Sequence, residues 1–399
     1  MTKWSSKWQT SLLITFGIFV LLIGGWLGYI TVLTKERNRA CRVSTLDNQG
    51  DNSSSTRMRL QDVLNEYSTQ KGGVGLQVTV MFPDGQTWNG VAGYADMAHP
   101  CPLTLDHHLY LGSITKLFTA TLVMKEVDNG SLFLDQKTNQ WIQVSSAENI
   151  TIRNLLSHTS GLPDYAQDTW FQIGWFGKPN KTWQPNELIR IMQDKPLRFS
   201  PGSRHEYSNS NYLLLGVILE KATGKPYSAI LQENVLAKLN LHDTFFLNYP
   251  DDMAIANGYD ETLLHLGRRN LSGFRRSLES GAYAAGGILS TSQDVARFAH
   301  ALFNGQVLSD TSLLQMETFV ETADADIPEQ TGYGLGIRHL VIDDQSLVGH
   351  TGSIPGYSGI VMHQVEKNYT IAVLSNLSTI GQTRLLAEIQ RIIVVPGSR

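Results

Sequence analysis

Cysteine is almost absent from this chain of 399 residues, which contains only Cys41 and Cys101. Two cysteines exclude a scaffold held together by several disulfides, and they exclude a four-cysteine zinc site. One bridge could join them, but Cys41 lies in a polar segment with nothing to fix its geometry. We therefore expect free or weakly paired thiols.

An excess of positive charge is also missing, because the chain has 32 Lys and Arg but 36 Asp and Glu, which gives a net charge of -4. Without a basic patch or an RNA-binding signature, nothing attracts nucleic acid in general. Hydrophobic residues make up 42% of the chain, which is enough for a substantial core.

Charged residues are entirely absent from residues 11–33. A helix of this length is about 35 Å long, enough to cross the hydrocarbon core of a membrane. A cleaved signal peptide normally has a shorter apolar region that ends in small residues, whereas this one ends in bulky ones. We expect residues 1–34 to be an uncleaved transmembrane anchor and residues 35–55 a polar tether. The domain at 56–395 would then lie outside the cytoplasm, or be secreted if the segment is cleaved.

Apolar periodicity and turn residues divide the domain into expected helices and strands. Helices are predicted at 56–70, 117–127, 212–222, 290–303 and 380–393, and strands at 74–82, 86–94, 346–351, 356–364 and 369–376. Gly224 is expected to end the third helix, and Thr291 or Ser292 to cap the fourth. The pattern indicates an α+β fold. An antiparallel five-stranded sheet (lobe 56–110 and 285–395) is flanked by the terminal helices, with a mostly helical lobe (111–284) inserted.

The first chemical motif is Ser113-Ile114-Thr115-Lys116, directly before a buried helix. A serine and a lysine three apart share one helix face, where the lysine can assist the serine as nucleophile. Taken alone the pattern is weak, because Ser113 could cap the helix and Lys116 could lie at the surface.

The second motif is Tyr207-Ser208-Asn209. A tyrosine in a loop before a helix can present its hydroxyl to a site, and Asn209 can donate to a substrate carbonyl. The alternative is that Tyr207 packs and Asn209 caps the helix.

The third motif is Gly349-His350-Thr351-Gly352-Ser353, at the end of a strand. Flanking glycines would let a ligand lie against this strand, and backbone N–H groups there can receive an oxyanion. The alternatives are an ordinary histidine and a β-bulge.

Together the three motifs resemble those of the β-lactamase and penicillin-binding protein family, in its class C and DD-peptidase-like branch. The resemblance covers about residues 58–395 and includes three supporting stretches, at 154–162, 284–290 and 332–336. It implies that Ser113 forms an acyl-enzyme, that Lys116 takes or relays the proton, and that Tyr207 is the general base. Asn209 would hold the substrate amide, with His350, Thr351 and Gly352 in the substrate-binding strand. The N–H groups of Ser113 and Ser353 would form the oxyanion hole, and no metal or cofactor is implied.

His350 departs from the commonest form of the motif, which has lysine there. A histidine is cationic only when protonated, so we expect affinity for anionic substrates to rise as pH falls through its titration. The aromatic residues of 166–183 either line the rim of the cleft or pack a long loop, and they are not assigned to the site.

The resemblance implies a serine hydrolase, which the expected helix would anchor to the membrane, with D-alanyl-D-alanine carboxypeptidase as the first choice. Its substrate would be a small molecule or peptide, and a β-lactamase or a small-ester hydrolase is the alternative within the same scaffold. A module of another class, which binds penicillin or wall fragments without catalysis, is disfavoured because the whole catalytic set is present.

Overall fold

The computed structural model describes residues 39–41, 55–142, 144, 148–262, 267–322 and 327–394. The predicted anchor at 1–34 lies outside these ranges, and so does most of the predicted tether. Within the described ranges, no helix is both long and apolar enough to cross a membrane.

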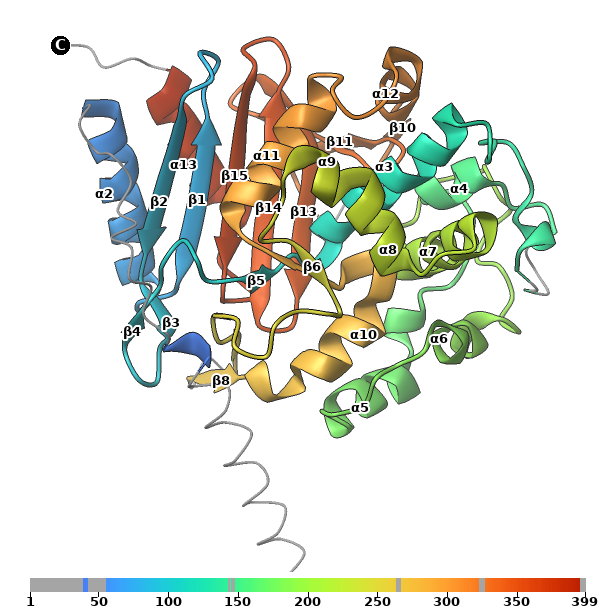
Figure 1. Cartoon of the computed structure of the whole chain (residues 1–399), viewed down its shortest axis with the longest axis horizontal. Coiled ribbons are helices and arrows are strands. Elements are labelled where there is room, and N and C mark those ends of the chain that lie inside the picture. The colour runs from blue at the N-terminus through green and yellow to red at the C-terminus, as the bar shows by residue number, and fades with distance from the viewer. Residues whose placement is uncertain are drawn as a thin grey trace, which may run out of the picture.

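A mixed fold is built on one antiparallel sheet of eight strands, in the order β10-β11-β12-β13-β14-β15-β1-β2 (Figure 1). The five predicted strands are confirmed as β1 (Leu76–Met81), β2 (Thr87–Ala92), β13 (Gln345–Ile354), β14 (Tyr357–Gln364) and β15 (Tyr369–Ser375). The first and last of these pair directly, with Val78 opposite Val373, so both ends of the domain build the sheet.

The prediction of five strands was incomplete, because the sheet has three further strands beside β13. They are β12 (Arg338–Ile342), β11 (Gln330–Tyr333) and β10 (Val320–Glu321). β10 has two residues and β11 contains Gly332, so neither shows an apolar alternation that marks a strand. The sheet therefore extends three strands beyond the motif at residues 349–353.

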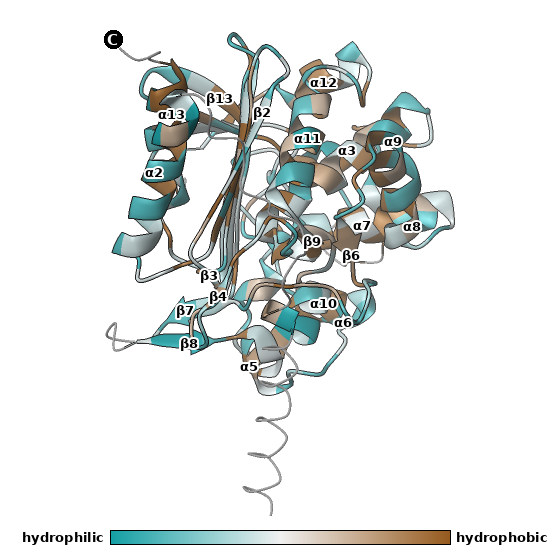
Figure 2. Cartoon of the chain, turned by 60° about the vertical axis from the view of Figure 1, so that its left-hand side comes forward, coloured by the Kyte–Doolittle hydropathy of each residue, from teal (hydrophilic) through white to brown (hydrophobic). Residues whose placement is uncertain are grey.

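Helices cover both faces of the sheet. α2 (Ser55–Gln70) and α13 (Gln382–Val394) pack on one face, and α11 (Ser292–Phe303) packs on the other (Figure 2). The predicted caps are confirmed, since Thr291 accepts a hydrogen bond from the N–H of Asp294 and Gly224 ends α7 (Asn209–Thr223) with a φ of 70°. These helices bury apolar residues against both faces, which fixes the sheet as a rigid platform.

The helical lobe is assembled around α3 (Thr115–Asp128), which is buried on nearly every side as predicted. α7 and α10 (Arg275–Gly286) both contact α3, while α5 (Thr169–Gly177) and α6 (Pro185–Met192) lie further out (Figure 1). The start of α3 faces β13, so the boundary between helices and sheet passes through Ser113.

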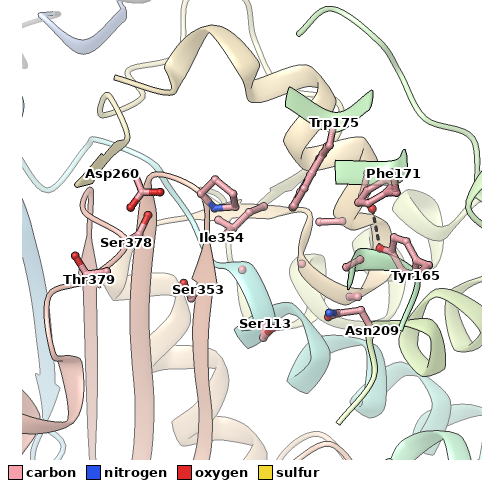
Figure 3. Close-up of a pocket in the computed structure, with 17 residues that line it drawn as sticks. Ser113, Tyr165, Phe171, Trp175, Asn209, Asp260, Ser353, Ile354, Ser378 and Thr379 are labelled. Carbon is pink, nitrogen blue, oxygen red and sulfur yellow. Dashed lines mark hydrogen bonds between the residues drawn. The ribbon is translucent and has the colours of Figure 1, made fainter. Parts of the chain in front are cut away.

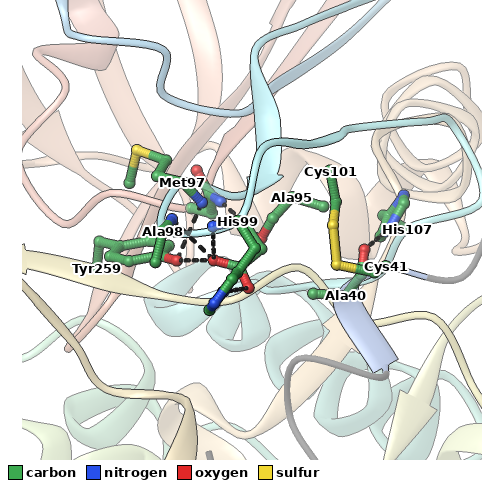
Figure 4. Close-up of a disulfide and its surroundings, with 11 residues drawn as sticks. Ala40, Cys41, Ala95, Met97, Ala98, His99, Cys101, His107 and Tyr259 are labelled. Atoms are coloured by element: carbon green, nitrogen blue, oxygen red, sulfur yellow. Dashed lines mark hydrogen bonds and ion pairs between the residues drawn. A yellow bond between two sulfur atoms is a disulfide. The ribbon is translucent and has the colours of Figure 1, made fainter. Parts of the chain in front are cut away.

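The two cysteines form a disulfide, which corrects the expectation of free thiols. Cys101 lies on β4 (Cys101–Pro102), and the segment before Cys41 packs on the domain, with Ala40 fully buried (Figure 4). The carbonyl of Ala40 lies 2.9 Å from Nε2 of His107. Sixty residues separate the cysteines in sequence, and sequence alone gave no reason for residues 39–41 to dock there.

Breaking this disulfide is expected to lower the free energy of unfolding by about 2 kcal/mol, because the cross-link restricts the unfolded chain. The expected value is at the lower end of the usual range, because the segment that the disulfide attaches to the domain, residues 39–41, is short. Urea unfolding of Cys101→Ala, compared with wild type with and without reductant, measures it. Equal midpoints for the oxidised wild type and the variant would show that the bridge contributes nothing.

Candidate active site

Ser113, the predicted nucleophile, lies on a tight turn between β5 (Leu109–Tyr110) and α3, in the short helix η1 (Gly112–Ile114). Gly112 has a φ of 51°, a conformation that favours glycine. A Cβ built on Gly112 would lie 2.8 Å from the backbone nitrogen of Ser353. The turn thus brings the nucleophile segment into close contact with β13.

Lys116 is fully buried and connects three parts of the site. Its Nζ donates to Ser113 Oγ at 2.9 Å, to Asn209 Oδ1 at 2.8 Å and to the carbonyl of Ala285 at 2.8 Å. Three acceptors match the three N–H bonds of an ammonium. The charge is held against Ser113 Oγ, where it favours negative charge that develops on this oxygen.

Asn209 is held in turn by a carboxylate that the sequence did not reveal. Its Nδ2 donates to Asp164 Oδ2 at 2.9 Å, and burial raises the pKa of Asp164. Because the amide oxygen serves Lys116 and one amide N–H serves Asp164, one N–H of Asn209 is left for a substrate. Asn209 therefore positions Lys116, in addition to its predicted role of holding a substrate amide.

Tyr207 lies beside the same ammonium, with its ring centre 4.9 Å from Nζ of Lys116. The guanidinium of Arg338 lies 5.1 Å from the same ring, and the ring of His158 is 4.2 Å away. The structure thus brings Ser113, Lys116, Tyr207 and Asn209 together as predicted from sequence. Arg338, on β12, was not predicted, because nothing in its surroundings in the sequence links it to the site.

His350 does not have the predicted role of a switchable cation in contact with substrate. Its side chain is fully buried, and its Nε2 lies 2.9 Å from the hydroxyl of Tyr333. Burial, followed by the nearby charges of Arg338 and Lys116, lowers the pKa of His350 well below its ordinary value. His350 does not line the cavity, and together with its lowered pKa this counts against the expected gain in anion affinity at low pH.

A different pH dependence follows for His350. The unfolded chain takes up a proton near pH 6.5 whereas the folded chain does not, so stability is complete above that pH and falls as pH decreases below it. Between pH 7 and pH 5, wild type is expected to lose about 2 kcal/mol more than His350→Gln. Urea unfolding at both pH values measures this, with His242→Gln at an exposed position as the control. Parallel losses in wild type and His350→Gln would contradict it.

The glycines of the third motif lie against neighbouring backbone, which counts against their predicted role of making room for a ligand. A Cβ on Gly352 would lie 1.9 Å from the carbonyl oxygen of Leu111, and a Cβ on Gly349 would lie 2.0 Å from that of Val361. Thr351 and Gly352 are buried, whereas Ser353 is exposed. The space at Gly352 is filled by the turn that carries Ser113, and Ser353 is the residue of this motif that lines the cavity.

A cavity of about 440 Å³ opens above Ser113 between the two lobes. Ser113, Asn209 and Ser353 line it, and an aromatic wall of Tyr165, Phe171 and Trp175 closes one end (Figure 3). Asp260, Ser378 and Thr379 lie at the opposite end of the same view. One residue from each of the three motifs, Ser113, Asn209 and Ser353, therefore lines the same cavity.

The aromatic segment of 166–183 is divided between the cavity and the surface. Phe171 and Trp175 line the cavity, and Trp175 is fixed by donating its indole N–H to the carbonyl of Ser277 at 2.8 Å. Trp170 on the same helix is 80% exposed. Sequence left this segment unassigned because its period does not show which side of a nine-residue helix faces the cavity.

The site has a serine that is hydrogen-bonded to a buried lysine, and it lies between a helical lobe and an antiparallel sheet. This combination defines a β-lactamase-fold serine hydrolase. The chain belongs to the Beta-lactamase family, whose family model matches residues 60–394.

Relatives within the family have several names. "Penicillin-binding protein 4*" of Bacillus subtilis is 28% identical over 71% of this chain, which spans only 64% of that relative's length. "Esterase EstB" of Burkholderia gladioli is 27% identical, over 79% of this chain and 88% of the esterase. Among solved structures, D-amino acid amidase from Ochrobactrum anthropi SV3 has a TM-score of 0.78 and 27% identity, covering 86% of this chain and 99% of the amidase. The names of these three proteins indicate different activities.

Proposed function

We propose that this protein is a serine hydrolase that cleaves an amide or ester through an acyl-enzyme on Ser113. The observation that carries the proposal is the continuous chain of hydrogen bonds from Ser113 through Lys116 and Asn209 to Asp164. A structural role alone does not require a buried ammonium next to a serine hydroxyl that opens into a cavity, because burying a charge is costly.

In acylation, Ser113 Oγ attacks the substrate carbonyl carbon, and its proton passes to Tyr207, which acts as a phenolate stabilised by the Lys116 ammonium 4.9 Å from its ring centre. The same proton is returned to the leaving nitrogen or oxygen, so the bond to the leaving group breaks without net gain or loss of protons. Water then attacks the acyl-enzyme carbonyl and releases an acid, which restores the hydroxyl of Ser113. Lys116 favours the early part of this sequence because its positive charge lies 2.9 Å from the attacking oxygen.

The N–H groups of Ser113 and Ser353 are proposed to hold the oxyanion. Both residues line the cavity, and the turn at Gly112 brings their segments together. Each donor of this kind contributes roughly 3–4 kcal/mol to the transition state in comparable hydrolases. The glycine turn and the strand end thus define where the substrate carbonyl lies.

The finer proposal for the substrate is a peptide ending in D-alanyl-D-alanine, cleaved by carboxypeptidase action. Relatives named penicillin-binding proteins support it. A second candidate is an amidase or esterase acting on small apolar substrates. The aromatic wall of Phe171 and Trp175 favours it, as does the similarity to the amidase structure.

The place of action is proposed to be outside the cytoplasm, with the charge-free residues 11–33 as membrane anchor. The disulfide between Cys41 and Cys101 supports an oxidising compartment, because such bridges are rare in the cytosol. A binding module without catalysis would not need Lys116 and Asp164 to be arranged around Ser113 in this way.

One panel tests the function and separates the candidates. The full chain in detergent is incubated with a D-alanyl-D-alanine peptide, nitrocefin, a short-chain nitrophenyl ester and D-phenylalanine amide, and rates are compared. A fluorescent penicillin or fluorophosphonate then labels the protein, and mass spectrometry of its peptides locates the adduct. The proposal predicts an adduct on Ser113 and hydrolysis of at least one substrate. If no adduct forms and no substrate is hydrolysed, the result would favour the binding module.

A further inference from the structure

The end of the cavity opposite the aromatic wall has a different chemical character. Asp260, Ser378 and Thr379 line it, and Asp260 is the one charged side chain among the described residues that line this cavity (Figure 3). The mechanism proposed above leaves this carboxylate without a role.

Asp260 is held on a rigid element rather than on a loose rim. It lies on β7 (Tyr259–Glu261), which pairs with β8 (Arg268–Asn270). The N–H of the neighbouring Tyr259 donates to the carbonyls of Gly356 and Asn376, at 3.1 and 2.9 Å. β7 is therefore fixed against the end of the sheet that also carries Ser353.

No cation in the described part of the chain forms an ion pair with Asp260. Arg269 faces it across the two strands, but the guanidinium of Arg269 lies 5.4 Å from the ring centre of Phe274 and is directed to that ring. One oxygen of Asp260 accepts from the N–H of Glu261 at 3.1 Å. A half-buried carboxylate at a cavity wall is thus held in place by backbone and is open to a ligand.

We propose that Asp260 is a specificity-determining residue that binds a cationic group of the substrate, typically an ammonium, while an apolar group of the substrate packs on Tyr165, Phe171 and Trp175. This inference rests on the proposed function, because it places the substrate carbonyl at Ser113 between the two ends. The preferred substrates are amides, peptides or esters that carry both an ammonium and an apolar group.

Charge complementarity is the physical reason. A fixed carboxylate attracts an ammonium most strongly where part of the surrounding water is excluded, and a hydrogen bond between two charged groups is stronger than a neutral one. A substrate carboxylate at the same end would be repelled. Asp260 therefore selects which end of a zwitterionic substrate occupies this side of Ser113.

Binding of three probes of similar shape tests this without relying on catalysis. They are 2-phenylethylammonium, 2-phenylethanol and 3-phenylpropionate, which carry a positive charge, no charge and a negative charge. Dissociation constants for the full chain are measured by ligand-observed NMR. We expect wild type to bind the ammonium about 10-fold more tightly than the alcohol, and the carboxylate most weakly.

In Asp260→Asn, the ratio of ammonium to alcohol affinity is expected to fall about 10-fold, towards equality. Glu261→Gln is the matched control, because Glu261 is the next residue of the same strand and does not line the cavity. It should keep the wild-type ratio. Equal affinities of wild type for the ammonium and the alcohol, or an unchanged ratio in Asp260→Asn, would overturn the proposal.

A kinetic arm separates this inference from the proposed function. The ratio of kcat/KM for D-phenylalanine amide over 3-phenylpropionamide should fall about 10-fold in Asp260→Asn, because the two amides differ in the ammonium. If Ser113 is acylated but this ratio is unchanged, the assignment of Asp260 fails alone. If neither amide is cleaved and no adduct forms, the proposed function fails, and the binding ratios still decide the role of Asp260.

Discussion

Ser113→Ala is expected to lower kcat/KM by about 10⁴- to 10⁶-fold on whichever substrate of the panel is cleaved, the range seen when a serine hydrolase loses its nucleophile. In the proposed mechanism the hydroxyl oxygen of Ser113 forms the acyl bond, and an alanine side chain has no oxygen to replace it. The partners Asn209 and Ala285 still accept from Lys116, so the fold is expected to survive. Initial rates and covalent labelling of both proteins measure the effect.

Ser353→Ala is the matched control for that experiment. Ser353 also lines the cavity and its side chain is exposed, but the proposed contribution to the oxyanion hole comes from its backbone N–H, which alanine keeps. A loss of less than about 10-fold is expected, because the peptide group is unchanged. If Ser113→Ala kept a tenth of the wild-type rate, or were still labelled, the nucleophile would be another residue.

The secondary structure of the sheet lobe could be predicted where the sequence has long periodic patterns. Strands β1 and β2, with a Pro-Asp-Gly turn between them, and the amphipathic α13 are such cases. Strands β10 and β11 were missed, because a strand of two residues or one interrupted by glycine has no period to read. The five-residue β12 was missed as well, although it contains no glycine. Their existence depends on the edge that β13 offers, which is a tertiary property.

The site was predictable where its members are neighbours in sequence. Ser113 and Lys116 lie one helical turn apart, and their hydrogen bond of 2.9 Å confirms that the two side chains share one face. Asp164 and Arg338 reach the same site from other elements, and no local pattern identifies them. His350 was misread for a similar reason, because spacing gives the order of residues along a strand but not how deeply each one is buried.

Gly352→Ala distinguishes the two readings of the third motif. If the glycine makes room for a ligand, alanine weakens substrate binding and leaves stability unchanged. In the structure the space is occupied by the carbonyl of Leu111, which lies 1.9 Å from the position of the added Cβ. Because both atoms belong to the backbone or are fixed to it, the strand and the nucleophile turn must separate.

That separation is expected to lower the free energy of unfolding by about 3 kcal/mol. It should also lower kcat by about 10²- to 10³-fold, because the N–H groups of Ser113 and Ser353 no longer point to one oxyanion position. Urea unfolding and steady-state kinetics measure both effects. Gly177→Ala is the control, since a Cβ there has no atom within 4 Å, and it should change neither quantity appreciably. A stable Gly352→Ala protein with a raised KM and normal kcat would restore the ligand reading, and with it a different binding mode along β13.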